Sequence, residues 1–219
     1  MDVMIADTLS LVEVLDRLRE RRPIFHAEAD MQFALAWGIQ GLAPDLHIRL
    51  ERQLEQRARL DLLVASPDWQ SQTAIELKYF TAKWSGRIDG EDYALAYQSA
   101  EDVRRYDFVK DITRVEAFVA RTPGANGAVV AISNESSYWR PKASDRVTFD
   151  QAFRLSEGYQ LTGELAWVSG GSLGSTKGRT EPLRLRGDYR CHWQPYSALA
   201  GAEANRDFRV LVVPIEPVA

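Results

Sequence analysis

The chain has 219 residues, of which 45% are hydrophobic and 26% charged, and its formal net charge is −4. These values support one well-packed domain and exclude a wholly disordered chain, and the weak negative charge means that any contact with nucleic acid must come from a local patch. The single cysteine, Cys191, excludes an internal disulfide, and the N-terminus lacks the features of a signal peptide. No apolar run approaches the roughly 20 residues that cross a bilayer, so we expect a cytoplasmic location and no membrane partner.

The first part of the chain predicts two helices followed by three strands. In residues 10–22, Ser10 and Glu13 have capping-box spacing and precede an apolar stripe, which indicates an amphipathic helix. Pro23 suits the first turn of a second helix, which Gly41 and Pro44 close. Alternating apolar residues then predict strands in residues 46–54, 59–65 and 73–80. The joins between them are short enough for an antiparallel meander.

The remainder predicts a helical crossover and further strands. Residues 91–121 favour helix throughout, although a phase change in the apolar stripe near Tyr106 leaves two helices as an alternative. Residues 127–133 form an apolar run typical of a buried strand, parallel to a neighbour. Further strands are predicted in residues 160–168, 183–193 and 208–215, with a flexible loop in residues 169–182. We therefore expect a single α/β domain over residues 1–219, with a core in residues 23–133 and a β-rich C-terminal extension in residues 134–219.

Two of the predicted strands contain charged residues. A period of two places Glu76 and Lys78 on one face of the strand 73–80, and antiparallel pairing with the preceding strand would bring Asp61 to the same end of the sheet. Two neighbouring carboxylates repel each other unless a cation lies between them, and hard oxygen ligands suit Mg²⁺ or Mn²⁺. A lysine beside them could orient a water or stabilise charge on a phosphate. The alternative is an ordinary solvated strand face.

A further carboxylate lies in the apolar stripe of the predicted second helix. Glu28 follows Ile24 by four residues and precedes Met31 and Leu35 on the same face, so it should point toward the sheet. A carboxylate there is costly unless it is paired or binds a metal. Two alternatives are that Glu28 reaches solvent at the edge of the stripe, or that it pairs with an arginine such as Arg59.

This order of a helical Glu, an Asp, a Glu-x-Lys, a helix and a strand resembles the PD-(D/E)XK nuclease superfamily over residues 23–133. The resemblance implies a restriction-endonuclease-like fold, in which helices flank a mixed sheet, and the hydrolysis of phosphodiester bonds, with DNA as the expected substrate. It implies that Asp61 and Glu76 bind Mg²⁺ or Mn²⁺, that Lys78 assists catalysis, and that Glu28 completes the site.

Other residues bear on this resemblance. Leu60 precedes Asp61 where the name of the superfamily implies Pro. Gln98, on the predicted helix after Glu-x-Lys, is a possible accessory residue, because some members have a polar residue near the metal there. A group of basic residues in the extension has few acidic residues among its members and is expected to bind DNA. Its members are Lys177, Arg179, Arg184, Arg186 and Arg190.

Two more cationic groups fit ordinary solvation as well as substrate contact. They are Arg17, Arg19, Arg21 and Arg22 in one group, and Arg104, Arg105, Lys110 and Arg114 in the other. Two hypotheses of function result. The first is a metal-dependent nuclease in which paired carboxylates hold Mg²⁺ and Lys78 orients the attacking water. The second is a catalytically inactive nuclease-like module that binds nucleic acid or protein. The complete set of four residues favours the enzyme, because inactive members usually lose a ligand.

Overall fold

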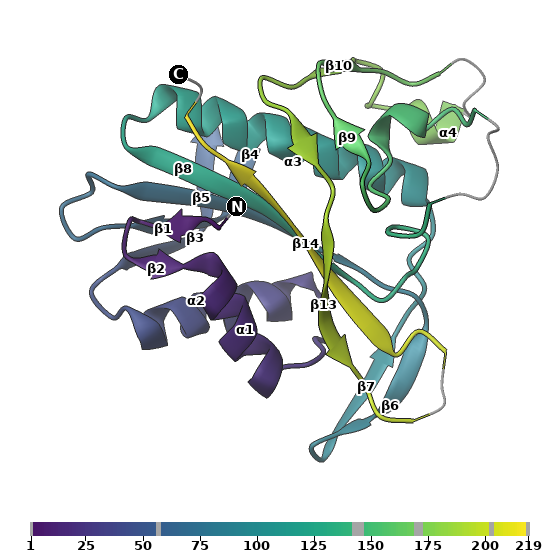
Figure 1. Ribbon diagram of the computed structural model, residues 1–219, viewed down its shortest axis with the longest axis horizontal. Coiled ribbons are helices and arrows are strands. Elements are labelled where there is room, and N and C mark those ends of the chain that lie inside the picture. The colour runs from purple at the N-terminus through teal and green to yellow at the C-terminus, as the bar shows by residue number, and fades with distance from the viewer. Residues whose placement is uncertain (1, 56–57, 142–146, 169–172, 202–203, 218–219) are drawn as a thin grey trace.

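A six-stranded mixed sheet runs through the centre of the molecule in the order β13-β14-β8-β5-β4-β3 (Figure 1). The computed structural model describes residues 2–55, 58–141, 147–168, 173–201 and 204–217. The strands of the sheet are β3 (His47–Glu55), β4 (Ala58–Ala65), β5 (Gln72–Phe80), β8 (Ala125–Ser133), β13 (Trp193–Ala198) and β14 (Asp207–Ile215). β5 and β8 are parallel, and the other neighbouring strands are antiparallel. The expected α/β class is confirmed.

Helices cover both faces of this sheet. α1 (Leu11–Arg21) and α2 (Glu28–Leu42) lie on one face, and α3 (Glu101–Arg121) lies on the other (Figure 1). The alternation along β5 produces this arrangement, because Ile75 and Leu77 are buried against the first two helices whereas Ala74 and Phe80 are buried with α3. Each face of the sheet therefore has its own apolar core, and β5 is part of both.

Several sequence-based expectations are confirmed. β3, β4 and β5 form the expected antiparallel meander, and β8 returns parallel to β5 after the crossover through α3. The first helix begins as its capping box predicts, since the N–H of Glu13 donates to the hydroxyl of Ser10 at 3.0 Å.

The predicted start of the second helix at Pro23 is wrong, because α2 begins at Glu28. The carboxylate of Asp30 accepts a hydrogen bond from the N–H of His26 at 2.9 Å and pairs with Arg22 at 2.6 Å. Phe25 lies in the segment between them and is fully buried. These contacts hold the residues before Glu28 in an irregular conformation, which could not be predicted from Pro23 alone.

The prediction of helix throughout residues 91–121 is also wrong. β7 (Glu91–Leu95) pairs with β6 (Trp84–Ile88) as an antiparallel hairpin, and α3 is one continuous helix that begins only at residue 101. The turn of the hairpin is Asp89-Gly90, whose φ angles are 50° and 87°. An Asp-Gly pair between strands favours this kind of tight turn. The sequence therefore did contain a signal for the hairpin, but the prediction gave more weight to the helical propensity of residues 91–121.

The last third of the chain contributes two strands to the central sheet and a set of short elements outside it. β14 lies antiparallel to β8 and β13 completes that edge of the sheet. The other elements are short and include η1 (Gln151–Phe153), β9 (Gln160–Leu161), β10 (Glu164–Leu165), α4 (Leu173–Thr176), β11 (Leu183–Arg184) and β12 (Tyr189–Arg190). Their buried residues join the core on the α3 side. Of the predicted loop 169–182, residues 169–172 lie outside the described residues.

The N-terminus adds a short hairpin of β1 (Met4–Ile5) and β2 (Leu9–Ser10). Among the described residues, no helix is long and apolar enough to cross a membrane.

Candidate active site at the fork between β4 and β5

Strands β4 and β5 separate part way along their length. Their pairing runs from Ala65 opposite Gln72 to Leu62 opposite Ile75 and then ends, whereas β5 continues to pair with β8 as far as Phe80. Because backbone N–H groups alternate between the two edges of a strand, β5 presents unpaired donors on the side that β4 has left. This fork is the feature that gathers the polar side chains.

Two carboxylates take the place of the missing strand partner. The N–H of Leu77 donates to Asp61 Oδ2 at 2.8 Å, and the N–H of Tyr79 donates to Glu28 Oε2 at 3.0 Å. Asp61 comes from β4 and Glu28 from the first turn of α2, so the fork brings together two residues far apart in sequence. The predicted inward orientation of Glu28 is therefore confirmed, and its partner is the backbone of β5, not Arg59.

Glu28 is exposed as a residue, but its carboxylate reaches into the protein. Desolvation raises the pKa of this carboxyl group, and the neighbouring charge of Lys78 opposes the increase. Gln32, one turn further along α2, supports the same fork. It donates to the carbonyl oxygen of Asp61 at 2.7 Å and to the carboxylate of Glu51 at 3.0 Å. The sequence analysis did not identify Gln32, whose position one turn after Glu28 was the available signal.

Glu76 and Lys78 project from the other face of β5 toward α3. Glu76 Oε1 lies 2.6 Å from Arg114 Nη1, and Lys78 Nζ lies 2.7 Å from Asp111 Oδ2. The same Arg114 nitrogen lies 2.9 Å from Asp111 Oδ1. Lys78 Nζ also donates to the carbonyl oxygen of Leu77 at 3.0 Å. α3 thus supplies an acid and a base that alternate in space with those of β5.

Burial and mutual repulsion shift the ionisation of this group. Desolvation, together with the charges of Asp111 and Asp61, raises the pKa of Glu76 to about 9, although Arg114 opposes the increase. Desolvation also raises the pKa of Asp111. For Lys78, burial lowers the pKa, but the charges of Asp111 and Glu28 outweigh this and the net shift is upward. Lys78 is therefore held in its charged form beside carboxylates that repel one another.

The structure brings together all the predicted catalytic residues and adds two from α3. We call this group the fork cluster; it comprises Glu28, Asp61, Glu76, Lys78, Asp111 and Arg114. Of the two interpretations of Arg114, ordinary solvation is wrong, because its guanidinium faces Glu76. A signal for Asp111 was present in the sequence, since it falls within the apolar stripe formed by Phe108, Ile112 and Val115.

The donor atoms of the fork cluster suit a hard divalent cation. Asp61, Glu76 and Asp111 offer only carboxylate oxygens, although Asp111 Oδ2 already lies 2.7 Å from Lys78 Nζ. Within the described ranges, however, no group of three or more His, Cys, Asp or Glu side chains is arranged so that it could hold a metal ion. Arg114 contacts Glu76 and Asp111, and Lys78 contacts Asp111. The oxygen atoms of the site therefore suit a hard cation, whereas its present arrangement pairs two of the three acids with internal cations.

Gln98 does not lie on the helix where it was predicted. It precedes α3, and its backbone N–H donates to the carbonyl oxygen of Thr81 at 2.9 Å while its side-chain Oε1 accepts from the N–H of Thr81 at 3.4 Å. The hairpin of β6 and β7 includes residues as far as Leu95, so α3 begins only at Glu101, after Gln98. Gln98 therefore secures the chain just beyond β5.

The residues expected to contact DNA lie in the C-terminal third and differ in their surroundings. Arg179 binds Asp107 through two hydrogen bonds of 2.8 and 2.7 Å, and Arg184 lies 2.6 Å from Glu164. Arg186 donates its backbone N–H to Glu116 at 2.8 Å, Lys177 is exposed, and Arg190 lines a surface cleft. Their role in DNA binding stays a prediction.

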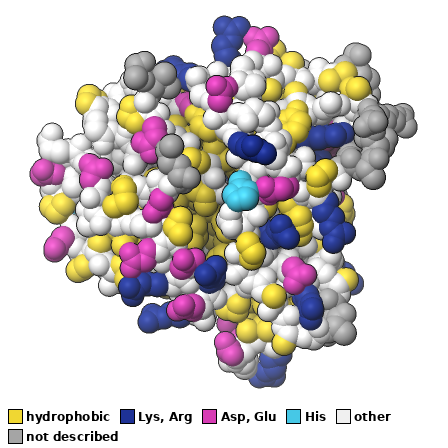
Figure 2. Space-filling model, viewed as in Figure 1, with side chains coloured by type: hydrophobic (Ala, Val, Ile, Leu, Met, Phe, Trp, Pro, Cys, Tyr) yellow, Lys and Arg dark blue, Asp and Glu magenta, His cyan; other side chains and the backbone are white. Residues whose placement is uncertain are grey.

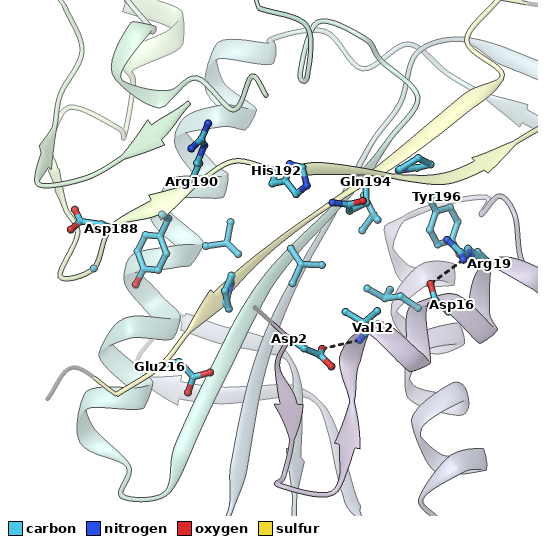
Figure 3. A pocket seen from close by; sticks show the side chains of 18 residues that line it. Asp2, Val12, Asp16, Arg19, Asp188, Arg190, His192, Gln194, Tyr196 and Glu216 are labelled. Carbon is cyan, nitrogen blue, oxygen red and sulfur yellow. Dashed lines mark hydrogen bonds and ion pairs between the residues drawn. The ribbon is translucent and has the colours of Figure 1, made fainter. Parts of the chain in front are cut away.

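The cleft of about 870 Å³ lies between α1 and strands β12 to β14 (Figure 3). Val210 and Val212 are among its apolar residues, and Arg19, Arg190 and His192 are among its charged and polar ones. Figure 2 shows hydrophobic side chains along a hollow on this face of the molecule. None of the residues of the fork cluster lines this cleft, so it is a separate feature.

No protein-family model, curated protein or solved structure matches the chain.

Proposed function

We propose that this protein is a divalent-metal-dependent nuclease that hydrolyses phosphodiester bonds, with DNA as the expected substrate, on a restriction-endonuclease-like fold. The observation that supports this most is the fork between β4 and β5. Glu28, Asp61, Glu76 and Lys78, which the PD-(D/E)XK resemblance selects, come from three elements and meet there.

In this proposal Asp61 and Glu76 hold Mg²⁺ or Mn²⁺. When bound, such a cation would make a water more acidic and stabilise negative charge on a phosphate. The backbone of Leu77 fixes two of the participating side chains, since its N–H binds Asp61 and its carbonyl oxygen accepts from Lys78. Lys78 can then donate to the attacking water or to a phosphate oxygen, because its ammonium group stays charged. Glu28 adds a carboxylate close to that ammonium group.

A second candidate is a nuclease-like module that binds nucleic acid or protein without catalysis. The ion pairs of Glu76 with Arg114 and of Lys78 with Asp111 favour it, because a closed network of this kind can be purely structural. The two candidates make different predictions for catalysis and for the response to metal.

The deciding experiment incubates the protein with plasmid and linear DNA in Mg²⁺, Mn²⁺ or EDTA. We expect cleavage in either metal and none in EDTA. Asp61→Asn and Glu76→Gln should each abolish cleavage while the protein remains folded, because both amides keep the size of the acid and an oxygen acceptor. Asp45→Asn, which changes an exposed acid, is the matched control and should cleave like the parent.

Two results would reject the enzyme. One is the absence of cleavage of any DNA or RNA in Mg²⁺ and Mn²⁺ by a folded parent protein. The other is cleavage by Asp61→Asn and Glu76→Gln at the parental rate. The first result, together with measurable DNA affinity that Ca²⁺ does not change, would favour the binding module.

A further inference from the structure

Helices α1 and α2 pack against each other on one face of the sheet (Figure 1) and form the walls of a groove of about 490 Å³. Small and apolar residues line much of it, among them Leu18 of α1 and Ala34 and Gly38 of α2. A Cβ atom at Gly41, another lining residue, would meet nothing within 4 Å, so the groove is open there. None of the residues of the fork cluster lines this groove, so it is a separate feature.

Two aromatic rings project into solvent beside this groove. Trp37, which lines it, is 72% exposed, and Phe33, one turn earlier on α2, is 48% exposed. The centroids of the two rings lie 6.2 Å apart, and their planes are inclined at 39°. Because aromatic side chains gain stability when they are buried, a pair exposed to this extent offers flat apolar surface to a partner outside the chain.

The charges of the groove are mainly positive, although the chain as a whole has a net charge of −4. Its charged lining residues are Arg17, Arg21 and Arg22 and one acid, Glu20. Arg22 already has an acidic partner. Arg17 pairs with Glu13 on the same helix, where both side chains are exposed, and such surface pairs contribute little. Among the described residues Arg21 has no ion pair, so Arg17 and Arg21, which share a helix face, are available to an anion.

We propose that this groove and the two rings bind single-stranded DNA, with a base stacked on Trp37 and the phosphates held by Arg17 and Arg21. Aromatic rings beside basic side chains are the combination that single-strand binding surfaces use, because every base has a flat face and every nucleotide carries a negative charge. The inference goes beyond the proposed function, since it requires neither a metal nor cleavage at the fork cluster.

Two other occupants fit this surface less well. The bases of a DNA duplex are already stacked on one another, so they leave no face for Trp37. A stable protein interface buries about 800 Å² on each partner, whereas α2 exposes only two large apolar side chains, Phe33 and Trp37. A few stacked bases need much less area than that.

The test is the fluorescence anisotropy of a labelled oligothymidylate of about ten nucleotides, measured in EDTA so that no metal-dependent cleavage interferes. Trp37→Ala should weaken binding about tenfold or more, the usual effect of losing one stacked base. Its melting temperature should stay close to that of the parent, because the residue is exposed. Trp37→Phe keeps a ring and should retain most of the affinity. Tyr97→Ala removes another exposed ring, outside the groove, and should bind like the parent.

The contact with phosphate is tested through the dependence of affinity on salt. Arg21→Gln should lower the slope of log affinity against log salt concentration by about 0.7, the value for one phosphate of a single strand. Lys110→Gln is the matched control, because it removes an exposed positive charge from α3, on the opposite face of the sheet. Its affinity and slope should equal those of the parent.

Several outcomes would overturn the inference. It is rejected if the parent binds no oligothymidylate, if Trp37→Ala binds like the parent, or if a duplex of the same length binds as tightly. Tighter binding of oligouridylate would assign the surface to RNA, and equal, Trp37-dependent binding of polyglutamate would assign it to an acidic protein segment.

The proposed function can fail separately. Cleavage of DNA in Mg²⁺ by a protein whose single-strand binding does not depend on Trp37 would reject this inference and leave the nuclease in place. Binding that depends on Trp37 and Arg21 in a protein that cleaves no nucleic acid would support the inference and reject the nuclease.

Discussion

Helix α3 takes part in two buried ionic groups, one at each end of the comparison between a structural ion pair and a proposed site. Near the start of the helix, Arg105 pairs with Asp150 at 2.9 Å and with Glu101 at 3.0 Å. Its guanidinium also donates to the carbonyl oxygen of Ser137 at 3.1 Å and lies 5.2 Å from the centre of the Tyr138 ring. This basic side chain therefore contacts two acids, a carbonyl oxygen and an aromatic ring.

The fork cluster, further along the same helix, has the same two-to-one ratio of acids to bases. It has four acids, Glu28, Asp61, Glu76 and Asp111, against two bases, and burial raises the pKa of Glu28, Glu76 and Asp111. Both groups are buried by the same helix, so burial alone does not distinguish a structural ion pair from a functional site. The raised pKa values of its acids are the feature that supports the proposed role of the fork cluster, because shifted pKa values are concentrated at functional sites.

The first prediction concerns the satisfied group and has the largest expected effect. Arg105→Met keeps much of the aliphatic packing but removes the guanidinium that pairs with Asp150 and Glu101. Breaking a buried ion pair from one side costs about 3–5 kcal/mol, so unfolding in urea should show a loss of that size. The shift in melting temperature caused by Mn²⁺ should match that of the parent. A loss below about 1 kcal/mol would mean that this pair behaves like a surface one.

The second prediction uses the pH dependence of stability. The pKa of Glu76 is raised to about 9, whereas a glutamate in an unfolded chain titrates near about 4.3. Between these values the folded protein binds more protons than the unfolded chain, so the contribution of Glu76 to stability is fully present below the lower pKa and is lost as the pH rises. Asp111, whose pKa is also raised, adds to the same trend.

Glu76→Gln should therefore flatten the decline of stability between pH 6 and 8. Removing one titrating group changes the slope by up to about 1.4 kcal/mol per pH unit. Urea unfolding at several pH values measures this, and Asp45→Asn is the control with an exposed acid. A parent and a Glu76→Gln protein with the same slope would show that Arg114 keeps Glu76 ionised over the whole range, which would make the fork cluster as well satisfied as the group around Arg105.

The part of the site on β4 and β5 was predictable because strand periodicity is a local property of the sequence. The alternation in residues 73–80 placed Glu76 and Lys78 on one face, and the stripe around Glu28 turned that carboxylate inward. The separation of β4 from β5 was not predictable in this way, since it depends on where two strands stop pairing and on carboxylates from β4 and α2 that replace the missing bonds.

The sequence analysis misread the charges on α3 for a related reason. Arg105 and Arg114 were grouped as surface charges because arginines on helices usually face solvent. Their burial depends on acids that lie far away in the chain, Asp150 for one and Glu76 for the other. Helical propensity also concealed the hairpin of β6 and β7, although Asp89-Gly90 marked its turn.

The last prediction separates the structural role of Asp61 from its proposed role with metal. Its carboxylate accepts a hydrogen bond from the N–H of Leu77 at the fork, so Asp61→Ala leaves a backbone donor without a partner. The expected cost is about 1–2 kcal/mol, whereas Asp61→Asn offers an amide oxygen in the same place and should unfold in urea close to the parent. Both variants should lose the stabilisation by Mn²⁺. If Asp61→Asn keeps that stabilisation, the carboxylate of Asp61 serves only to close the strand edge, and the fork cluster would be a structural ionic group like the one around Arg105.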